Sequence, residues 1–350
     1  MGRRRGRGWR GVKPRLGQLS SETTGPPLHA AAGRAAASCR AWRAGLIAAL
    51  AVCAGSARAQ GPGADGPLVL RTGHSVRATG LGGAGAALMG DAASVFANPA
   101  GLALVRHVAL EAGFFGGPLD AYQATAAVGL RLIQFDLGFG LKYYNFGAEP
   151  EVVPDPTTGG VTGMPTGATV NAGEFLGVGS LVYRFGLVAL GGSVKLARQR
   201  VAGLEARGVS GDLGLAIAVF DILALAVAVQ NVSGNWDEAG GLVFPRLTRA
   251  GFTMNYVDPQ ETWRLLSTIE LQWPEARSTR FVFGLEGGAV VHGLGILGRT
   301  AYRSLEDGAD VSHFTYGLSL TLARLTVDYA YEPTNLLGDG SQRIGLRLTL

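Results

Sequence analysis

The chain has 350 residues, with 31 Lys or Arg and 26 Asp or Glu, and a formal net charge of +5. Residues 1–59 contain 11 of the basic residues and one acid, Glu22, which leaves 20 basic and 25 acidic residues and a net charge of −5. A basic nucleic-acid-binding surface is therefore not expected beyond residue 59. Both cysteines, Cys39 and Cys53, also lie before residue 60, which excludes disulfides, Cys-ligated zinc and a Cys nucleophile from the rest.

Residues 41–60, AWRAGLIAALAVCAGSARAQ, have the three-part layout of a secretory signal peptide. A positive flank precedes an apolar run over residues 46–53, and the small-x-small sequence of residues 57–59 follows. The run is too short to remain as a membrane anchor. A lipoprotein signal is the alternative, but Val52 stands before Cys53, where a small residue is wanted. We expect residues 1–59, including their Arg-rich extension, to be removed by cleavage after Ala59.

The next segment, RATGLGGAGAALMGDAASVFANPAGLA over residues 77–103, contains Gly80, Gly82 and Gly85 in the order G-x-G-x-x-G. A dinucleotide-binding loop needs a buried strand before it, a helix after it and an acidic residue about 20 positions later. Asp91 comes too early to be that acid. Gly and Ala instead permit close approach of backbone to backbone. We therefore expect a small-residue segment that fits tightly against surrounding chain.

Turn-forming residues close this segment. We expect Asn98 to cap a turn, Pro99 to fix φ, and Gly101 to permit a left-handed exit. Together with Asp91 and Ala100 they form a candidate site, which we call the plug motif. Folding of the segment is its expected role, and direct contact with a ligand is the alternative.

From residue 106 onwards, apolar residues alternate with polar or small ones. In YQATAAVGLRL, Tyr122, Ala126 and Leu130 share one face, while Gln123 and Arg131 share the other. Most of these segments are about 10 to 12 residues long, against five or six in ordinary sheets, and tilted membrane strands need the longer span. We expect about 14 strands, near residues 106–115, 121–132, 134–145, 173–184, 186–197, 206–219, 221–231, 246–257, 262–273, 279–289, 292–303, 312–321, 323–332 and 341–350.

Connections and aromatic residues separate a membrane barrel from a soluble sandwich, which would also alternate. Long polar connections, above all 146–172 and 233–245, alternate with very short ones, and a sandwich has no reason to sort its loops in this way. Trp263 and Trp273 lie ten residues apart on one face, roughly 25 Å along a barrel axis, which matches the spacing of interfacial aromatic girdles. The sequence therefore predicts an all-β fold: a transmembrane antiparallel β-barrel over residues 105–350, with residues 60–104 as a plug inside its lumen.

Charged residues at the polar positions of these strands are expected to face the lumen, because each charge facing lipid costs about 2–4 kcal/mol. Most should pair within the wall, and a minority could contact a ligand. The candidates are Arg131, Asp136, Lys142, Lys195, Asp212, Glu270, Glu286, Arg324, Asp328, Arg343 and Arg347. No histidine pair with metal-ligand spacing and no nucleophile-elbow motif is found beyond residue 59, so we expect no enzyme, no metal and no cofactor.

The small-residue segment also resembles a known family. Its glycines at 80–85, the pair Asp91-Ala92 and the run Asn98-Pro99-Ala100-Gly101-Leu102 are similar to the N-terminal region of the FadL/PorV-like outer-membrane barrels. VQNVSGNW from Val229, followed by Pro245 and RAGFTM, resembles the PorV/PorQ-type branch, which we favour. The apolar final strand is similar to the terminal signal of such barrels but ends in Leu350 instead of an aromatic residue.

The resemblance implies a 14-stranded barrel in the outer membrane of a Gram-negative type envelope, plugged by its N-terminal segment. It implies transport or binding of hydrophobic small molecules such as fatty acids. The alternative is an outer-membrane component or partner of a protein secretion or surface-attachment system of the type IX kind. The expected partners are outer-membrane lipid, a hydrophobic ligand and, in the alternative, secretion-system proteins, with no nucleic acid.

Overall fold

A computed structural model of the chain describes residues 66–117, 120–219, 222–232, 242–259, 262–275, 277–292, 294–304, 312–333 and 340–350. The expected signal peptide, its cleavage site and residues 60–65 of the plug lie outside these ranges. None of the helices in the described ranges is long and apolar enough to cross a membrane.

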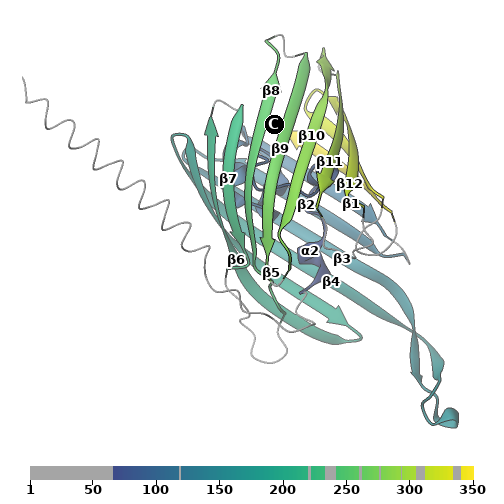
Figure 1. The fold of residues 1–350 in the computed structure, drawn as a ribbon. Helices are drawn as coiled ribbons and strands as arrows, with labels where there is room; N and C mark the ends of the chain where they lie inside the picture. The colour runs from purple at the N-terminus through teal and green to yellow at the C-terminus, as the bar shows by residue number, and fades with distance from the viewer. Residues whose placement is uncertain are drawn as a thin grey trace, which may run out of the picture. The chain divides into compact units, whose positions relative to one another are not determined.

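Within the described ranges, 14 antiparallel strands form one closed barrel (Figure 1). Each strand pairs with its neighbours in sequence, and β1 closes the barrel against β14, from Ala109 opposite Thr349 to Gly116 opposite Gln342. The strands are β1 (Val108–Gly116), β2 (Tyr122–Arg131), β3 (Phe135–Pro154), β4 (Gly163–Phe185), β5 (Val188–Val201), β6 (Leu204–Val219), β7 (Leu223–Gln230), β8 (Leu247–Val257), β9 (Trp263–Pro274), β10 (Arg280–Val291), β11 (Leu294–Arg303), β12 (Phe314–Leu322), β13 (Leu325–Glu332) and β14 (Ser341–Thr349). The predicted fold class is confirmed.

The two faces of the barrel wall differ in chemistry. In β11, Ile296 is 56% exposed on the outer face, whereas Leu297 and Arg299 are only 4% and 5% exposed on the inner face. Trp263 and Trp273 are exposed at opposite ends of β9, as the girdle argument predicts. Because large apolar side chains cover the outside of a closed sheet, lipid and not a second protein layer is the medium that covers them.

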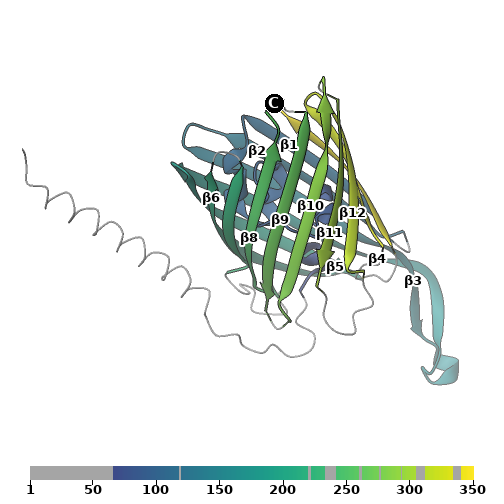
Figure 2. The ribbon, with the colours of Figure 1, turned by 45° about the horizontal axis from the view of Figure 1, so that its top comes forward.

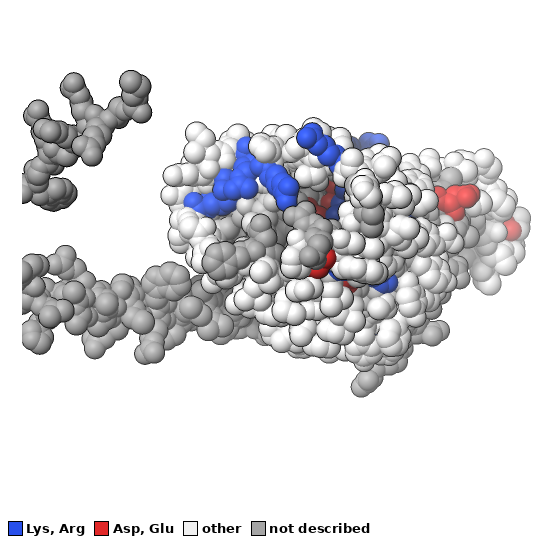
Figure 3. All heavy atoms as spheres, turned by 90° about the horizontal axis from the view of Figure 1, so that it is seen from above, with Lys and Arg blue, Asp and Glu red and all other residues white. Residues whose placement is uncertain are grey.

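The connections at one end of the barrel are tight. β4 ends at Phe185 before β5 starts at Val188, and β12 ends at Leu322 before β13 starts at Leu325. We call the end of the barrel that carries these turns the tight end. The last residues of β14 also lie there. The longer connections lie at the opposite end, which we call the long end. Figure 3 views the protein from the tight end, where Lys and Arg gather along part of the rim. In outer-membrane barrels the tight turns face the periplasm and the long connections face outwards.

The expected loop at 146–172 is wrong. β3 continues to Pro154, β4 starts at Gly163, and a 3-10 turn, η3 (Pro156–Thr158), joins them into a hairpin that extends beyond the barrel (Figure 1). The polar stretch RQRVAGLEA, residues 198–206, also predicts a long connection, but β5 reaches Val201 and β6 starts at Leu204, so the connection is short. In both places backbone pairing continues through residues that lack the regular apolar alternation of the membrane strands. Residues 233–241 of the other long connection lie outside the described ranges.

Short helices fill the barrel lumen (Figure 2). They are α2 (Leu68–Arg71), α3 (Val76–Gly80), η1 (Ala92–Phe96) and η2 (Pro99–Leu104). We refer to residues 66–105 as the plug. Its apolar side chains Val95 and Leu102 are fully buried, and a Cβ on Gly138 of β3 would lie 2.5 Å from both of them. Glycines on the inner face of the wall therefore make the room that the plug occupies.

Candidate functional site

The plug motif folds the plug by local hydrogen bonds. Asn98 caps η2, because its Oδ1 accepts from the Ala100 N–H at 3.0 Å, and its Nδ2 donates to the Ala86 carbonyl at 2.6 Å. Pro99 occupies the first helical position, where a missing N–H costs nothing. Asn98 and Ala100 are completely buried against the wall.

The expected left-handed conformation of Gly101 is wrong. Gly101 lies inside η2, and its φ is not positive. Its small size matters instead, because a Cβ at this position would lie 2.8 Å from both Cβ and Oγ of Ser94. The Gly101 carbonyl also accepts from the Gly90 N–H at 2.8 Å. Close packing of η1 on η2, and not an exit turn, explains this glycine.

Arg77 of α3 connects two acidic groups across the lumen. Its Nε and Nη2 each donate to the Glu286 carboxylate of β10 at 2.9 Å, while Nη1 donates to Asp91 Oδ2 at 2.8 Å. The side chains of Arg77 and Glu286 are 5% and 1% exposed. Such a bidentate contact in a buried place is stronger and more directional than an exposed ion pair.

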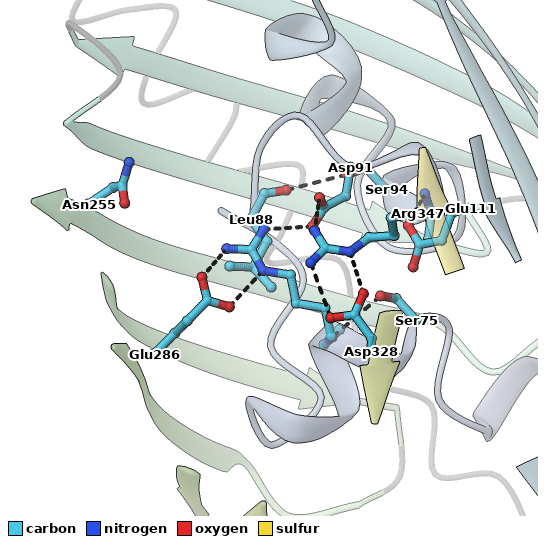
Figure 4. Close-up of polar contacts among 12 residues, drawn as sticks. Ser75, Leu88, Asp91, Ser94, Glu111, Asn255, Glu286, Asp328 and Arg347 are labelled. Atoms are coloured by element: carbon cyan, nitrogen blue, oxygen red, sulfur yellow. Dashed lines mark hydrogen bonds and ion pairs between the residues drawn. The ribbon is translucent and has the colours of Figure 1, made fainter. Parts of the chain in front are cut away.

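Asp91 continues the network toward β14. Its Oδ1 accepts from Arg347 Nη1 at 3.1 Å, and Arg347 also pairs with Asp328 of β13 (Figure 4). Arg299 of β11 contacts Asp328 and Glu286, which closes the chain of alternating charges. We call Arg77, Asp91, Glu286, Arg299, Asp328 and Arg347 the charge network. Burial raises the pKa of Asp91, but the Arg77 and Arg347 guanidiniums outweigh that effect and hold its pKa at about 2.

The G-x-G-x-x-G segment binds a carboxylate of the protein itself. Glu270 of β9 accepts from the backbone N–H groups of Gly85 and Ala86, both at 2.7 Å, and pairs with Arg249 at 2.9 Å. The backbone donors that a phosphate-binding loop would offer are thus occupied at Gly85. A Cβ on Gly80 would lie 3.2 Å from Cα of Gly317 in β12, so this segment lies against the wall as expected.

A second group of charges holds the beginning of the plug. Lys142 of β3 donates to the carbonyls of Val69 and Thr72, at 2.7 and 3.0 Å. Glu174 of β4 accepts from the Val69 N–H at 2.6 Å. Arg343 of β14 is 7% exposed and lies over the Phe115 ring at 4.4 Å. Within the described residues neither Lys142 nor Arg343 forms an ion pair.

The structure also places the other candidates of the barrel wall. Lys195 and Asp212 pair with each other at 2.8 Å, and buried Asp136 pairs with Arg184 at 2.8 Å. Arg131 is exposed at the end of β2, where its Nη1 donates to the carbonyl of Val105 at 3.1 Å.

Arg324 is not in the lumen. It is exposed in the two-residue turn between β12 and β13, next to Ala323, which has a φ of 52°. Strand alternation does not continue through a turn, so the position of Arg324 could not be inferred from parity with β13.

Several residues of the site were missed. Arg299 lies on the inner face of β11 and Arg249 near the start of β8, so the parity that identified Glu286 and Arg347 would also have found them. Arg77 has no such signal, because the plug lacks a strand period. The one sequence feature that points to a role for Arg77 is that it is a single charged residue in a run of small residues.

The arrangement is suited to holding a plug. Among the described residues, no group of three or more His, Asp or Glu side chains has the geometry to hold a metal ion. The charge network instead joins the plug directly to Glu286 of β10 and Arg347 of β14, and through Arg347 to Asp328 of β13.

Comparisons with known proteins give the fold. No protein-family model and no curated relative matches the chain. Among solved structures, the Pseudomonas putida toluene transporter TodX is similar at 12% identity with a TM-score of 0.52, covering 79% of this chain and 96% of its own. The Ralstonia pickettii toluene transporter TbuX is 14% identical with a TM-score of 0.53, and the match covers 79% of this chain and 98% of TbuX. The CymD monoaromatic hydrocarbon channel is 12% identical with a TM-score of 0.52, and the match covers 79% of this chain and 98% of CymD.

The chain has the fold of the FadL-like outer-membrane barrels. At these identities the likeness establishes the architecture alone. The PorV/PorQ-type branch that the sequence favours receives no support from these matches.

Proposed function

We propose that the chain is an outer-membrane transport protein that binds hydrophobic small molecules, such as fatty acids, and lets them pass. The fold it shares with TodX, TbuX and CymD supports this function, since their names describe toluene transport and a monoaromatic hydrocarbon channel. The secretion-partner alternative has no comparable support.

The observation that carries the proposal is the plug. It fills the lumen with buried groups, so a wide water-filled pore is absent from the part of the barrel that the structure describes. A protein whose barrel served only as a scaffold would gain more stability from an apolar filling than from buried charges. Polar contacts such as Arg77 to Glu286 and Lys142 to Val69 can be exchanged for water, which suits a plug that has to shift.

Lys142 and Arg343 favour binding of an amphiphile that carries an acidic group, and such a molecule is one proposed substrate. Both are buried basic side chains on the inner wall, and among the described residues neither forms an ion pair with a carboxylate. A buried guanidinium without a hydrogen-bonded carboxylate is costly, and a ligand carboxylate would satisfy it with charge-assisted hydrogen bonds. A fatty acid supplies this carboxylate, whereas toluene does not.

Ligand binding to the purified barrel tests the proposal. We expect the wild type to bind a long-chain fatty acid and toluene, and a deletion strain to take up less of the physiological ligand. Arg343→Gln should weaken binding of the fatty acid about tenfold and leave binding of toluene unchanged, because only the acid loses a charge-assisted hydrogen bond.

The exposed turn residue Arg324 gives the matched control, since Arg324→Gln removes the same charge outside the lumen. Absence of binding of either ligand by the wild type, together with normal uptake in the deletion strain, would overturn the proposal. Equal losses for fatty acid and toluene in Arg343→Gln would show that Arg343 acts only on the fold.

A further inference from the structure

The outer faces of β5 and β6 change from apolar to basic toward the long end of the barrel. In β5, Val194 and Leu196 are exposed outward and are followed on the same face by Arg198 and Arg200. Arg207 of β6 is the cross-strand partner of Arg198. The stripe that meets lipid therefore ends in three outward arginines on two paired strands.

These arginines surround a single carboxylate. Glu205, the partner of Arg200, accepts hydrogen bonds from Arg198 and Arg207, and its Oε2 lies 3.8 Å from Arg200 Nη2. The arginine side chains remain 44%, 63% and 71% exposed, in the order 198, 200 and 207. One carboxylate cannot neutralise three guanidiniums, so a net charge of +2 faces outward here.

An apolar groove of about 490 Å³ lies directly beside this basic group. Phe175 of β4, Leu196 and Val209 line it together with Arg198 and Arg207. Because the two arginines follow Leu196 and precede Val209 along their strands, they border the groove on the side of the long end.

The aromatic residues beside the groove indicate its depth in the membrane. Phe175 is the cross-strand partner of Tyr143, and both rings are 39% exposed on the outer face, as residues of an interfacial girdle are. The groove therefore spans the edge of the hydrocarbon layer, and the arginines lie at the level of lipid headgroups. At the long end these headgroups belong to the outer leaflet.

We propose that β4, β5 and β6 form a binding site for a phosphorylated lipid of the outer leaflet. The arginines bind its phosphate through bidentate, charge-assisted hydrogen bonds, and an acyl chain occupies the apolar groove. Charge complementarity selects a phosphorylated headgroup, and the groove selects a lipid over free phosphate. This site lies outside the lumen and is independent of the transport proposal.

Binding of lipopolysaccharide, whose lipid moiety carries phosphates, to the purified full-length barrel tests the site by native mass spectrometry. We expect the wild type to retain lipopolysaccharide, and Arg198→Gln/Arg207→Gln to bind it at least about tenfold more weakly, since two charge-assisted hydrogen bonds are removed. Arg106→Gln/Arg324→Gln is the matched control, because both of its arginines are exposed at the tight end. Each variant is compared at an equal folded fraction, measured by heat-modified migration in gels.

Two further probes identify what is recognised. Enzymatically dephosphorylated lipopolysaccharide should bind as weakly to the wild type as the intact lipid binds to Arg198→Gln/Arg207→Gln, and inorganic phosphate should not displace the intact lipid. The proposal is overturned if the variant and the wild type bind alike, if loss of phosphate leaves binding unchanged, or if inorganic phosphate competes fully. Co-purification of an acidic protein in place of lipid at these arginines would also overturn it.

Discussion

Asp91 lies between two guanidiniums that come from distant parts of the chain, Arg77 of the plug and Arg347 of β14. Its side chain is 15% exposed, so water screens these contacts only weakly. Asp91 therefore has a role in the charge network. Its position after the G-x-G-x-x-G sequence did not reveal that role. Among the plug-motif residues, Asp91 is the one that joins the plug to the wall by charge.

Replacing Asp91 with Asn should detach the plug from β14 and lower the free energy of unfolding by about 3 kcal/mol or more, because two buried cations lose their shared anion. Thermal unfolding in detergent measures the loss. Asp155→Asn is the control, since Asp155 contacts only its own turn in the exposed hairpin. Equal stability of Asp91→Asn and Asp155→Asn would contradict the role of the charge network.

The pKa of Asp91 also sets a pH dependence. The folded value of about 2 is below the ordinary 3.8, so this carboxylate contributes stability that is fully present above pH 3.8 and is lost as pH falls through about 2. Hydrogen exchange of plug amides, corrected for intrinsic rates, should therefore stay slow from neutral pH to about pH 4 and accelerate below it. Loss of protection already near pH 6 would show that another group controls the plug.

At the scale of elements, the plug and the wall fit because glycines of the wall lie opposite side chains and backbone atoms of the plug. A Cβ on Gly140 of β3 would lie 2.5 Å from the Phe96 ring, and one on Gly191 of β5 would lie 2.6 Å from the Ala100 nitrogen. Alternation predicted that glycines line the inner face but not which segment they meet. That information lies in the turns of the plug, whose 3-10 geometry has no strong sequence period.

The contact between Gly214 and Asn98 tests this fit. A Cβ at Gly214 of β6 would lie 2.0 Å from Asn98 Oδ1, so Gly214→Ala should displace the cap of η2 and cost about 1–3 kcal/mol. Limited proteolysis should then cut the plug sooner than in the wild type. Gly179→Ala of β4 is the matched control, because no atom lies within 4 Å of its added Cβ. The close-fit account fails if both variants resist protease equally.

At the scale of the whole molecule, the number and order of the strands could be read from the sequence, because lipid outside and polar groups inside impose a period of two. The hairpin beyond the barrel could not, since its residues lack this regular apolar alternation. Arg324 and Gly101 show the same limit: a turn interrupts parity, and a glycine can be required by packing instead of by φ. Arg77 is placed by tertiary contact alone.

Electrical conductance across a planar lipid bilayer tests most directly whether the plug closes a membrane barrel. The full-length protein should insert and conduct almost no ions, because the plug occupies the lumen. A variant without residues 66–104, with barrel assembly verified by heat-modified migration, should conduct in steps typical of an open pore. Open-pore conductance by the full-length protein, or a silent barrel after removal of the plug, would contradict the account.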